Sequence, residues 1–536
     1  MKIYNIARSF SLLILVFLFL QNPVLSQEEE TGANKIIQVL KNIDNFYVDE
    51  TDPVELSDKA IIQLLTQLDP HSEYFTKDEA EELMRNLDGS FEGVGITYSL
   101  LRDTIFILST VTGGPADLAG MRAGDRIIKI EDKTVAGVDI SDNEIRKMLL
   151  GEKGTRVHLS VKRNGRKSLI FMELTRDEIK PGSIPAAYML NDDVAYIKLE
   201  RFSLHADNEF EDSLRSLKKQ GAEHLIFDLR GNSGGYLRAC LNIADIFWKS
   251  REIIVATRGA NLDERIYETT LLSSFPDGRL AVLIDENSAS ASEIIAGAVQ
   301  DLDRGIILGR RSYGKGLVQR PFYLNDGSLM RLTVARYYTA SGRCIQKSYE
   351  NGKTAYVEES QHRMRNEPPV DTGEVFFTKN GRKVYAEGAV YPDLYIPSDN
   401  DKYSDIYKTY LSTGNVFDLV HLFTDKYRLA LTGLYKGFDS YKKNYELDDL
   451  FLDELYKNLP DSLMPDSGCP AFNVTDKIHL KALIAGDLWG RHYYQVYLNE
   501  YSNLVNTALR ILTDEKKYRK ILSEDFNPKN EQAWQH

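Results

Sequence analysis

Three serines stand at every second position near the middle of the chain, and a lysine between two glycines follows them. The serines are Ser288, Ser290 and Ser292, and the lysine is Lys315. A serine hydroxyl is a weak nucleophile that needs a base within hydrogen-bond reach, and a lysine can be that base only if burial lowers its pKa enough to leave it neutral. The segment therefore offers a hydroxyl nucleophile and an amine base.

The surrounding pattern predicts how these groups are positioned. Apolar residues 280–284 indicate a buried strand before the serines, and residues 291–300 indicate a short helix after them. Ser290 and Glu293 match a capping box, which predicts Ser290 at the N-cap and leaves the N–H of Ala291 as an unpaired donor. Such a donor stabilises negative charge that develops during acyl transfer.

Residue types alone favour a simpler alternative, in which Ser290 only caps the helix and Lys315 is a solvated loop cation. A third segment changes this balance. Residues 224–235 form an apolar strand that ends in the sequence Asp-Leu-Arg-Gly-Asn-Ser-Gly-Gly. A Gly-rich turn after a strand leaves backbone N–H groups free to bind an anion.

These three segments, in this order, resemble the C-terminal processing peptidases, also called tail-specific proteases. The resemblance rests on residues 228–235, 288–293 and 314–319. It implies a ClpP- or crotonase-like α/β serine protease core that needs neither a cofactor nor a metal ion.

The resemblance also assigns roles to individual residues. It makes Ser290 the nucleophile and Lys315 the base, and Gln319 helps to orient the lysine. It forms the oxyanion hole from the N–H of Ala291 and from an N–H of the glycine pair, and it does not decide between Gly234 and Gly235.

A second unit, residues 89–175, alternates short strands with Gly-rich turns and contains a capping box at Ser141 that predicts a helix. It resembles a PDZ domain. The resemblance implies a loop that receives the carboxylate of a peptide C-terminus, and a groove between residues 96–100 and 141–150 in which the peptide adds as a strand. The residues of this loop are Gly93, Val94, Gly95 and Ile96. The alternative is a small β-domain without a ligand.

The chain has 536 residues, more than one core normally serves, so several domains are expected. Strands alternate with helices in the core, which indicates parallel pairing in an α/β sheet. Residues 346–372 are polar and suggest an exposed excursion. The predicted organisation is a signal peptide (1–26), a helical region (27–88), the PDZ domain (89–175), the protease core (176–398) and a C-terminal helical domain (399–536) without assigned chemistry.

The N-terminus has the pattern of a secretory signal. Lys2 and Arg8 precede an apolar stretch over residues 11–20, and small residues allow cleavage after Ser26. We therefore expect an extracytoplasmic protein, in the bacterial periplasm. The alternative is an uncleaved N-terminal anchor, which would associate the protein with a membrane. The net charge of −13 gives no basic surface for nucleic acid.

The histidines and cysteines suggest no other chemistry. The nine histidines lack the spacing of a zinc protease, so no metal site is expected. His71 is the most attractive histidine for a catalytic role, but its Leu-Asp-Pro-His-Ser stretch also occurs in the resembled family, where it is structural. Cys240, Cys344 and Cys469 are interpreted as free thiols, although one pair could bridge in an oxidising compartment.

The sequence thus predicts a serine endopeptidase that recognises protein C-termini through its PDZ domain and cleaves near them with a Ser-Lys dyad. Its partners would be protein substrates, and a homo-oligomer or an adaptor is compatible with the chain. We further hypothesise that peptide binding to the PDZ domain aligns Lys315. The alternative is a PDZ-containing binding protein whose core is catalytically inert. A crotonase-like acyl-CoA enzyme shares the core but fits neither the signal peptide nor the PDZ domain.

Overall fold

The computed structural model describes residues 32–363, 373–386, 388–447, 451 and 472–526. The predicted signal peptide and Cys469 lie outside the described residues. The chain divides into two compact units, residues 1–68 and 69–536.

The described part of the first unit consists of two helices, α2 (Gly32–Phe46) and α3 (Pro53–Thr66), as the apolar spacing predicted. Asp52 caps α3 by accepting the N–H of Val54 at 2.8 Å. No residue of α2 is buried.

The core of the second unit is a six-stranded sheet in which the first strand is antiparallel and the others are parallel. In spatial order the strands are β10 (Ala186–Met189), β11 (Val194–Lys198), β12 (His224–Asp228), β15 (Leu280–Ile284), β16 (Ile306–Gly309) and β21 (Leu394–Tyr395). Every residue of β12 and β15 is buried. Parallel strands covered on both faces are apolar throughout, which explains the uninterrupted run at residues 280–284.

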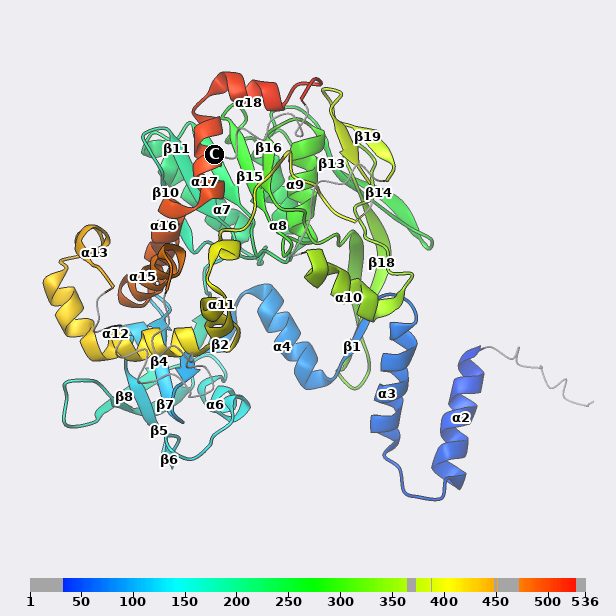
Figure 1. Cartoon of the computed structure of the whole chain (residues 1–536). Coiled ribbons are helices and arrows are strands. Elements are labelled where there is room, and N and C mark those ends of the chain that lie inside the picture. Colours follow the sequence, from blue (N-terminus) through cyan, green and yellow to red (C-terminus); the bar gives the residue numbers. More distant parts are fainter. Residues whose placement is uncertain (1–31, 364–372, 387, 448–450, 452–471, 527–536) are drawn as a thin grey trace, which may run out of the picture. The chain divides into compact units, whose positions relative to one another are not determined.

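Helices cover both faces of this sheet (Figure 1). One face packs against α7 (Ala206–Lys219), α8 (Leu237–Asp245) and α9 (Ala291–Asp301). The other face packs against α17 (Asn503–Leu512) and α18 (Glu515–Ile521) from the end of the chain. The last helices therefore complete the core, a role that the sequence did not suggest for residues 399–536.

A second, antiparallel sheet lies beside the core and carries the lysine side of the candidate site. Its strands are β1 (Glu73–Phe75), β13 (Ile253–Gly259), β14 (Leu262–Glu268), β17 (Leu317–Tyr323) and β18 (Leu329–Thr339). β17 and β1 both pair with β18. A hairpin turn joins β17 to β18, and the N–H of Leu324 donates to the carbonyl of Ser328 at 2.9 Å.

The PDZ-like unit forms a sheet of its own, with α6 (Asp142–Leu149) beside it. Its strands are β3 (Ile96–Leu100), β4 (Ile105–Thr110), β5 (Arg126–Ile130), β6 (Lys133–Thr134), β7 (Arg156–Lys162) and β8 (Ile170–Thr175), and α5 (Pro115–Leu118) is a short second helix. Ser141 and Glu144 form the predicted capping box at the start of α6.

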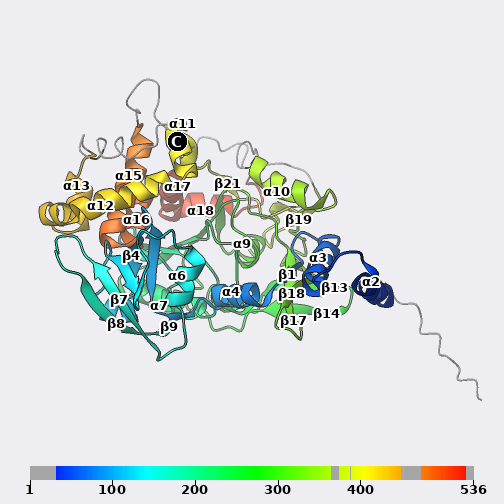
Figure 2. The same ribbon diagram turned by 90° about the horizontal axis from the view of Figure 1, so that it is seen from below.

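The strand β2 (Phe91–Gly93) precedes the PDZ-like unit and the strand β9 (Asp177–Ile179) follows it. The two strands pair antiparallel. Helix α4 (Lys77–Asp88) leads from β1 to β2, and Figure 2 shows it between β1 and α6. Glu82 of α4 forms an ion pair with Arg146 of α6. Asp88 of α4 accepts a hydrogen bond from the hydroxyl of Tyr236, the residue before α8. The predicted helical region 27–88 is therefore interrupted, since β1 and α4 belong to the second unit.

Residues 399–526 are helical where described, as predicted. The elements are η1 (Asp399–Lys402), α11 (Asp405–Ser412), α12 (Asn415–Leu434), α13 (Phe438–Asn444), α15 (Val474–Trp489), α16 (Arg491–Tyr501), α17 and α18. Buried tyrosines such as Tyr407 and Tyr441 fill the common core of α11, α12, α13, α15 and α16. Asp425 on α12 forms an ion pair with Arg126 of the PDZ-like unit at 2.8 Å. None of the described helices combines the length and apolar character needed to cross a bilayer.

The predicted exposed excursion at residues 346–372 is confirmed over residues 346–359 except at two positions, Lys347 and Tyr356. These two residues are 3% and 2% exposed, and Tyr356 lies on helix α10 (Gly352–Arg363). Both polar side chains are buried because each finds partners: the amine of Lys347 donates to the carbonyl of Tyr356 at 2.8 Å, and the hydroxyl of Tyr356 meets His71. Residues 364–372 lie outside the described residues, and the chain then forms the hairpin of β19 (Val375–Phe377) and β20 (Lys383–Tyr385).

Candidate active site

Ser290 lies at the turn between β15 and α9 in a strained conformation. Its φ of 54° and ψ of −110° are unusual for a residue with a side chain and cost about 1–3 kcal/mol. The residue is the N-cap of α9, and it forms the predicted capping box with Glu293, although its hydroxyl makes no capping hydrogen bond of normal geometry.

The two outer serines have a different role from the middle one. The hydroxyl of Ser288 donates to the carbonyl of Leu229 at 2.9 Å, and that of Ser292 donates to the carbonyl of Asn232 at 2.8 Å. Both serines are fully buried. They bind the turn that carries Ser290 to the Gly-rich loop.

The Gly-rich loop begins at Asp228, which is buried at the end of β12. Its carboxylate accepts hydrogen bonds from the hydroxyl of Tyr196 at 2.5 Å and from the guanidinium of Arg230 at 2.6 Å. Burial raises the pKa of Asp228, but Arg230 and Lys198 outweigh it and hold that pKa well below its usual range. The carboxylate therefore stays charged and fixes the start of the loop.

Gly234 brings this loop against the nucleophile. A Cβ at Gly234 would lie 2.9 Å from the Cβ of Ser290 and 3.1 Å from the nitrogen of Ala291, so only glycine fits there. A Cβ at Gly235 would lie 2.2 Å from the carbonyl oxygen of Phe202. Both glycines also have positive φ, at 105° and 144°.

The structure separates the two glycines as oxyanion donors. The N–H of Gly234 donates to Oδ1 of Asn232 at 2.9 Å and is therefore occupied. Within the described part of the chain, the N–H groups of Ala291 and Gly235 have no acceptor. The geometry favours Ala291 and Gly235 as the donor pair and gives Gly234 the close approach to Ser290.

Glu293 connects the nucleophile turn to the lysine loop. Its buried carboxylate accepts the N–H of Ser290 at 2.9 Å, the N–H of Lys315 at 2.8 Å and the N–H of Gly314 at 2.7 Å. The hydroxyl of Ser312 donates to it at 2.5 Å. Burial raises the pKa of Glu293, and the four donors oppose this rise. The glutamate of the predicted capping box thus has a second task that the sequence did not reveal.

The amine of Lys315 is mostly buried and lies next to Gln319. Its Nζ donates to Oε1 of Gln319 at 2.9 Å. Burial, assisted by the nearby charge of Arg331, lowers the pKa of Lys315 to about 8, against the opposing effect of carboxylates. The neutral amine that a base requires is therefore a minor form at pH 7 and the major form above about pH 8. Among the described residues, no hydrogen bond joins Lys315 to Ser290 in this state.

His71 belongs to the same site but not as a triad histidine. Its carbonyl accepts the Nε2 amide of Gln319, and its ring Nε2 lies 2.8 Å from the hydroxyl of Tyr356. Burial, followed by the charge of Lys315, lowers the pKa of His71 to about 3. The ring is therefore neutral, and it packs as the sequence suggested. Its contact with the lysine's orienting residue was not predicted.

The predicted peptide-binding loop lies between two strands of the PDZ-like unit. Gly93 ends β2 and Ile96 begins β3, so Val94 and Gly95 form the loop itself. In the described residues, the N–H groups of Val94 and Gly95 have no acceptor, while their carbonyls accept N–H groups from within the unit. Two unused N–H groups suit a carboxylate ligand.

The predicted groove between β3 and α6 is bridged by one contact. The hydroxyl of Tyr98 on β3 donates to Oδ1 of Asp142 on α6 at 2.7 Å. Asp142 is also paired with Arg146 one turn further along the helix, at 2.6 Å.

The two described thiols are free, and neither has a proposed role in the reaction. Cys240 is buried and donates to the carbonyl of Ala291 at 3.3 Å, and Cys344 is half-buried.

Known protein families match two regions of the chain. A family model described as peptidase family S41 matches residues 193–353, and one described as a PDZ domain matches residues 106–163. The carboxy-terminal processing protease CtpB of Bacillus subtilis is 33% identical over 325 residues, which are 60% of this chain and 67% of that protein. The carboxy-terminal-processing protease of Bartonella bacilliformis is 33% identical over 313 residues, 58% of this chain and 71% of that protein.

Among solved structures, the photosystem II D1 C-terminal processing protease is 28% identical, with 59% of this chain and 90% of that chain covered and a TM-score of 0.34. The chain thus spans about two thirds of the length of the curated relatives it matches. These matches confirm the predicted family and the predicted α/β protease fold with a PDZ domain. The chain belongs to peptidase family S41 and is a serine peptidase of the carboxy-terminal processing type.

Proposed function

We propose that this protein is an endopeptidase that takes the C-terminus of a protein substrate into its PDZ domain and cleaves near that end, with Ser290 as the nucleophile and Lys315 as the base. One observation carries this assignment. The buried carboxylate of Glu293 holds the backbone of Ser290 and the backbone of Lys315 at the same oxygen.

In the proposed first step, the neutral amine of Lys315 takes the proton of the Ser290 hydroxyl while Oγ forms a bond to the peptide carbonyl carbon. The electron pair of the carbonyl moves onto its oxygen, which the N–H groups of Ala291 and Gly235 stabilise. The C–N bond then breaks, and the ammonium of Lys315 protonates the departing amine. Water hydrolyses the acyl-enzyme with Lys315 again as the base.

The amine must leave Gln319 or share its hydrogen bond to reach Ser290. The four-carbon stem of lysine has the torsional freedom for this movement, and catalytic hydrogen bonds often tighten only when substrate is bound. Substrate binding would therefore complete the dyad. This fits our hypothesis that an occupied PDZ domain favours the aligned state.

For recognition, the N–H groups of Val94 and Gly95 would bind the terminal carboxylate of the substrate. The segment before that carboxylate would pair with β3 beside α6, as in other cases of strand addition. An apolar C-terminal residue suits this site because the neighbouring core of the unit is apolar, with Ile145 and Leu149 on α6.

We also propose that cleavage takes place outside the cytoplasm, after removal of residues 1–26. The support is the basic, apolar and small-residue order at the N-terminus. N-terminal sequencing of the mature protein should find a start just after Ser26. A start at Met1 would instead indicate an anchor.

The proposed activity is tested with an unfolded protein that ends in an apolar tail and with the same protein whose tail ends in aspartates. We expect the wild type to cleave the first substrate faster, and Ser290→Ala to bind the apolar tail without cleaving it. Cleavage by Ser290→Ala would place the nucleophile elsewhere. If neither form cleaves either substrate, the protein is a binding protein with an inert core.

A further inference from the structure

We propose that His71 and Tyr356 are positioning residues for the catalytic base: together they fix the side-chain amide of Gln319 so that its oxygen faces the amine of Lys315. This inference rests on the proposed role of Lys315. Both residues lie outside residues 193–353, the region that the peptidase family model matches.

The amide of Gln319 is held at both ends. Its Nε2 donates to the carbonyl of His71, and its Oε1 accepts the amine of Lys315 at 2.9 Å. A flipped amide would point its NH₂ group at the amine and lose the acceptor. The carbonyl of His71 therefore determines which end of Gln319 meets the lysine.

The backbone of His71 is in turn fixed to the sheet that carries Gln319. Asp69 is buried, and its Oδ1 accepts the N–H of His71 at 2.8 Å and the hydroxyl of Thr333 at 3.1 Å. The hydroxyl of Ser72 accepts the N–H of Thr333 at 3.1 Å. Thr333 lies on β18 directly opposite Gln319 on β17. The position of the His71 carbonyl is thus set relative to the same strand pair as Gln319.

The ring of His71 adds a second attachment, to α10. The hydroxyl of Tyr356 lies 2.8 Å from Nε2, and the two rings meet edge to face at 5.2 Å. A neutral ring nitrogen can accept this hydroxyl proton, and the low pKa of His71, about 3, keeps the ring neutral. The hydroxyl of Tyr356 therefore orients the residue whose carbonyl holds Gln319.

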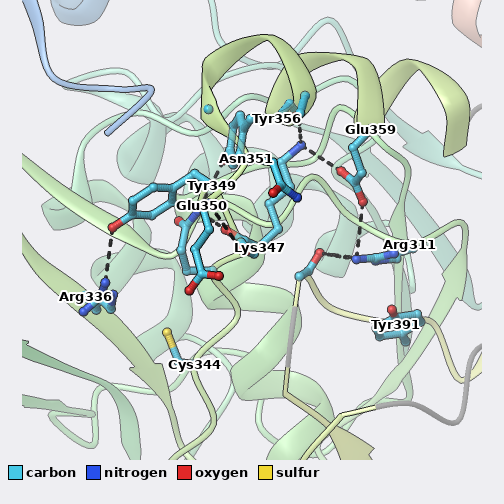
Figure 3. A pocket seen from close by; sticks show the side chains of 15 residues that line it. Arg311, Arg336, Cys344, Lys347, Tyr349, Glu350, Asn351, Tyr356, Glu359 and Tyr391 are labelled. Atoms are coloured by element: carbon cyan, nitrogen blue, oxygen red, sulfur yellow. Dashed lines mark hydrogen bonds and ion pairs between the residues drawn. The ribbon is translucent and has the colours of Figure 1, made fainter. Parts of the chain in front are cut away.

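Helix α10 is itself anchored by charged side chains that line the pocket in Figure 3. The amine of Lys347 donates to the carbonyl of Tyr356 at 2.8 Å and to Glu359 at 3.0 Å, and it lies 4.0 Å from the centre of the Tyr356 ring. Arg311 lies 3.8 Å from the same glutamate. These residues line a cavity of about 630 Å³ beneath the helix. Tyr356 is thereby held at its backbone carbonyl and at its ring.

Neither His71 nor Tyr356 has a hydrogen bond to Ser290 among the described residues. His71 reaches the base through Gln319, and Tyr356 reaches it through His71 and also through Gln346, whose Oε1 accepts the N–H of Gly316. Four charged groups influence the pKa of the Lys315 amine. They are Arg331 on β18, Glu73 on β1, Glu293 on α9 and Asp69 before β1. None of them is altered by removing the Tyr356 hydroxyl, so a change in the titration of Lys315 would report its contact with Gln319.

The test compares Tyr356→Phe, Gln319→Ala and the double variant in the full-length protein, with kcat and KM measured from pH 6 to pH 10. We expect Tyr356→Phe to lower kcat about five- to tenfold with KM within about twofold, because the variant loses the hydrogen bond to His71 at 2.8 Å and the longer one from Nε2 of Gln346 at 3.4 Å. In the Gln319→Ala background the same change should cost less than about twofold, because the group it positions is gone. The acid limb of the pH profile of kcat should move to lower pH in both single variants. The ammonium of Lys315 is more easily deprotonated when it loses its acceptor, so its pKa falls.

Tyr407→Phe is the matched control. Tyr407 is also buried and its hydroxyl also meets a buried histidine, His479, at 2.8 Å, but both lie in the C-terminal helices. Its kcat and acid limb should equal those of the wild type. The proposal is overturned if Tyr356→Phe acts like this control, or if its effect multiplies fully with that of Gln319→Ala.

His71→Phe provides a second variant that keeps the backbone carbonyl and a ring but removes Nε2. It should lower kcat as much as Tyr356→Phe does, and the double variant His71→Phe with Tyr356→Phe should be little slower than either. A double variant in which the two losses of kcat multiply fully would contradict the proposal. Lys315→Ala separates this inference from the proposed function. If Lys315→Ala cleaves normally, the proposed base is wrong; if it is inactive while Tyr356→Phe is unaffected, only the positioning role fails.

Discussion

Ser290 and Lys315 donate their backbone N–H groups to the same atom, Oε2 of Glu293, at 2.9 and 2.8 Å. The glutamate is fully buried in the first turn of α9. A shared acceptor holds the two loops at a fixed separation although no hydrogen bond joins the two side chains in the described structure. The spacing of nucleophile and base is thus set by the backbone before any substrate binds.

Glu293→Gln should damage both loops. The glutamine places an NH₂ group where one carboxylate oxygen now accepts two hydrogen bonds, so buried donors would face a donor. We expect a loss of about 1–3 kcal/mol in the free energy of unfolding and at least a tenfold loss of kcat. Thermal unfolding and cleavage rates measure this, with the exposed Glu50→Gln as a control that should change neither. Wild-type activity in Glu293→Gln would show that the shared acceptor is dispensable.

The three alternating serines should separate stability from catalysis. Ser288→Ala and Ser292→Ala leave the carbonyls of Leu229 and Asn232 without a hydroxyl partner, so each should lower stability by about 1–3 kcal/mol. Ser290→Ala removes no side-chain hydrogen bond of normal geometry from the described structure and should unfold within a few degrees of the wild type while losing cleavage. Denaturant titration with a cleavage assay tests the contrast. It fails if Ser290→Ala is the least stable of the three.

The pH dependence follows from the pKa of Lys315. Burial lowers this pKa to about 8, and only the neutral amine accepts a proton, so kcat/KM should rise with pH and level off above about pH 8. Stability should follow the same group: the unfolded amine holds its proton up to about its usual pKa of 10.5, so folding is favoured increasingly as pH rises between about 8 and 10.5. Stopped assays over a buffer series measure the rate. A rate that falls steadily from pH 6 to pH 9 would exclude an amine base.

The bond between Tyr98 and Asp142 joins the two sides of the predicted PDZ groove. If a peptide strand separates these sides, Tyr98→Phe should bind a peptide with an apolar C-terminus about two- to fivefold more tightly, because less must be broken. Fluorescence anisotropy with a labelled peptide measures the affinity, and the same peptide with an amidated end should bind weakly to both forms. Weaker binding by Tyr98→Phe would mean that the contact supports the groove.

The sequence predicted the elements whose signal is local. The buried strand at residues 280–284, the helix that starts at Ser290 and the capping box at Ser141 all follow from periodicity and short-range spacing. The order of the three motifs identified the family, which the comparisons confirm. These features need no knowledge of which distant segments meet.

The features that the sequence did not predict depend on long-range contacts or on backbone conformation. Tyr356 and His71 are 285 residues apart, and a polar segment around Tyr356 gave no sign of burial. The amphipathic pattern of α17 predicted a helix but could not say that it covers the core sheet. The choice between Gly234 and Gly235 required the position of Asn232, whose side chain occupies one of the two N–H groups.

The central claim is that the amine of Lys315 activates the hydroxyl of Ser290. The most direct test is the initial rate at which Lys315→Ala cleaves an unfolded protein with an apolar C-terminus at pH 9, relative to the wild type and with folding checked by circular dichroism. The account predicts a folded variant that is slower by about 10²–10⁴-fold, the usual contribution of a general base. A folded Lys315→Ala variant that cleaves within about threefold of the wild-type rate would contradict it.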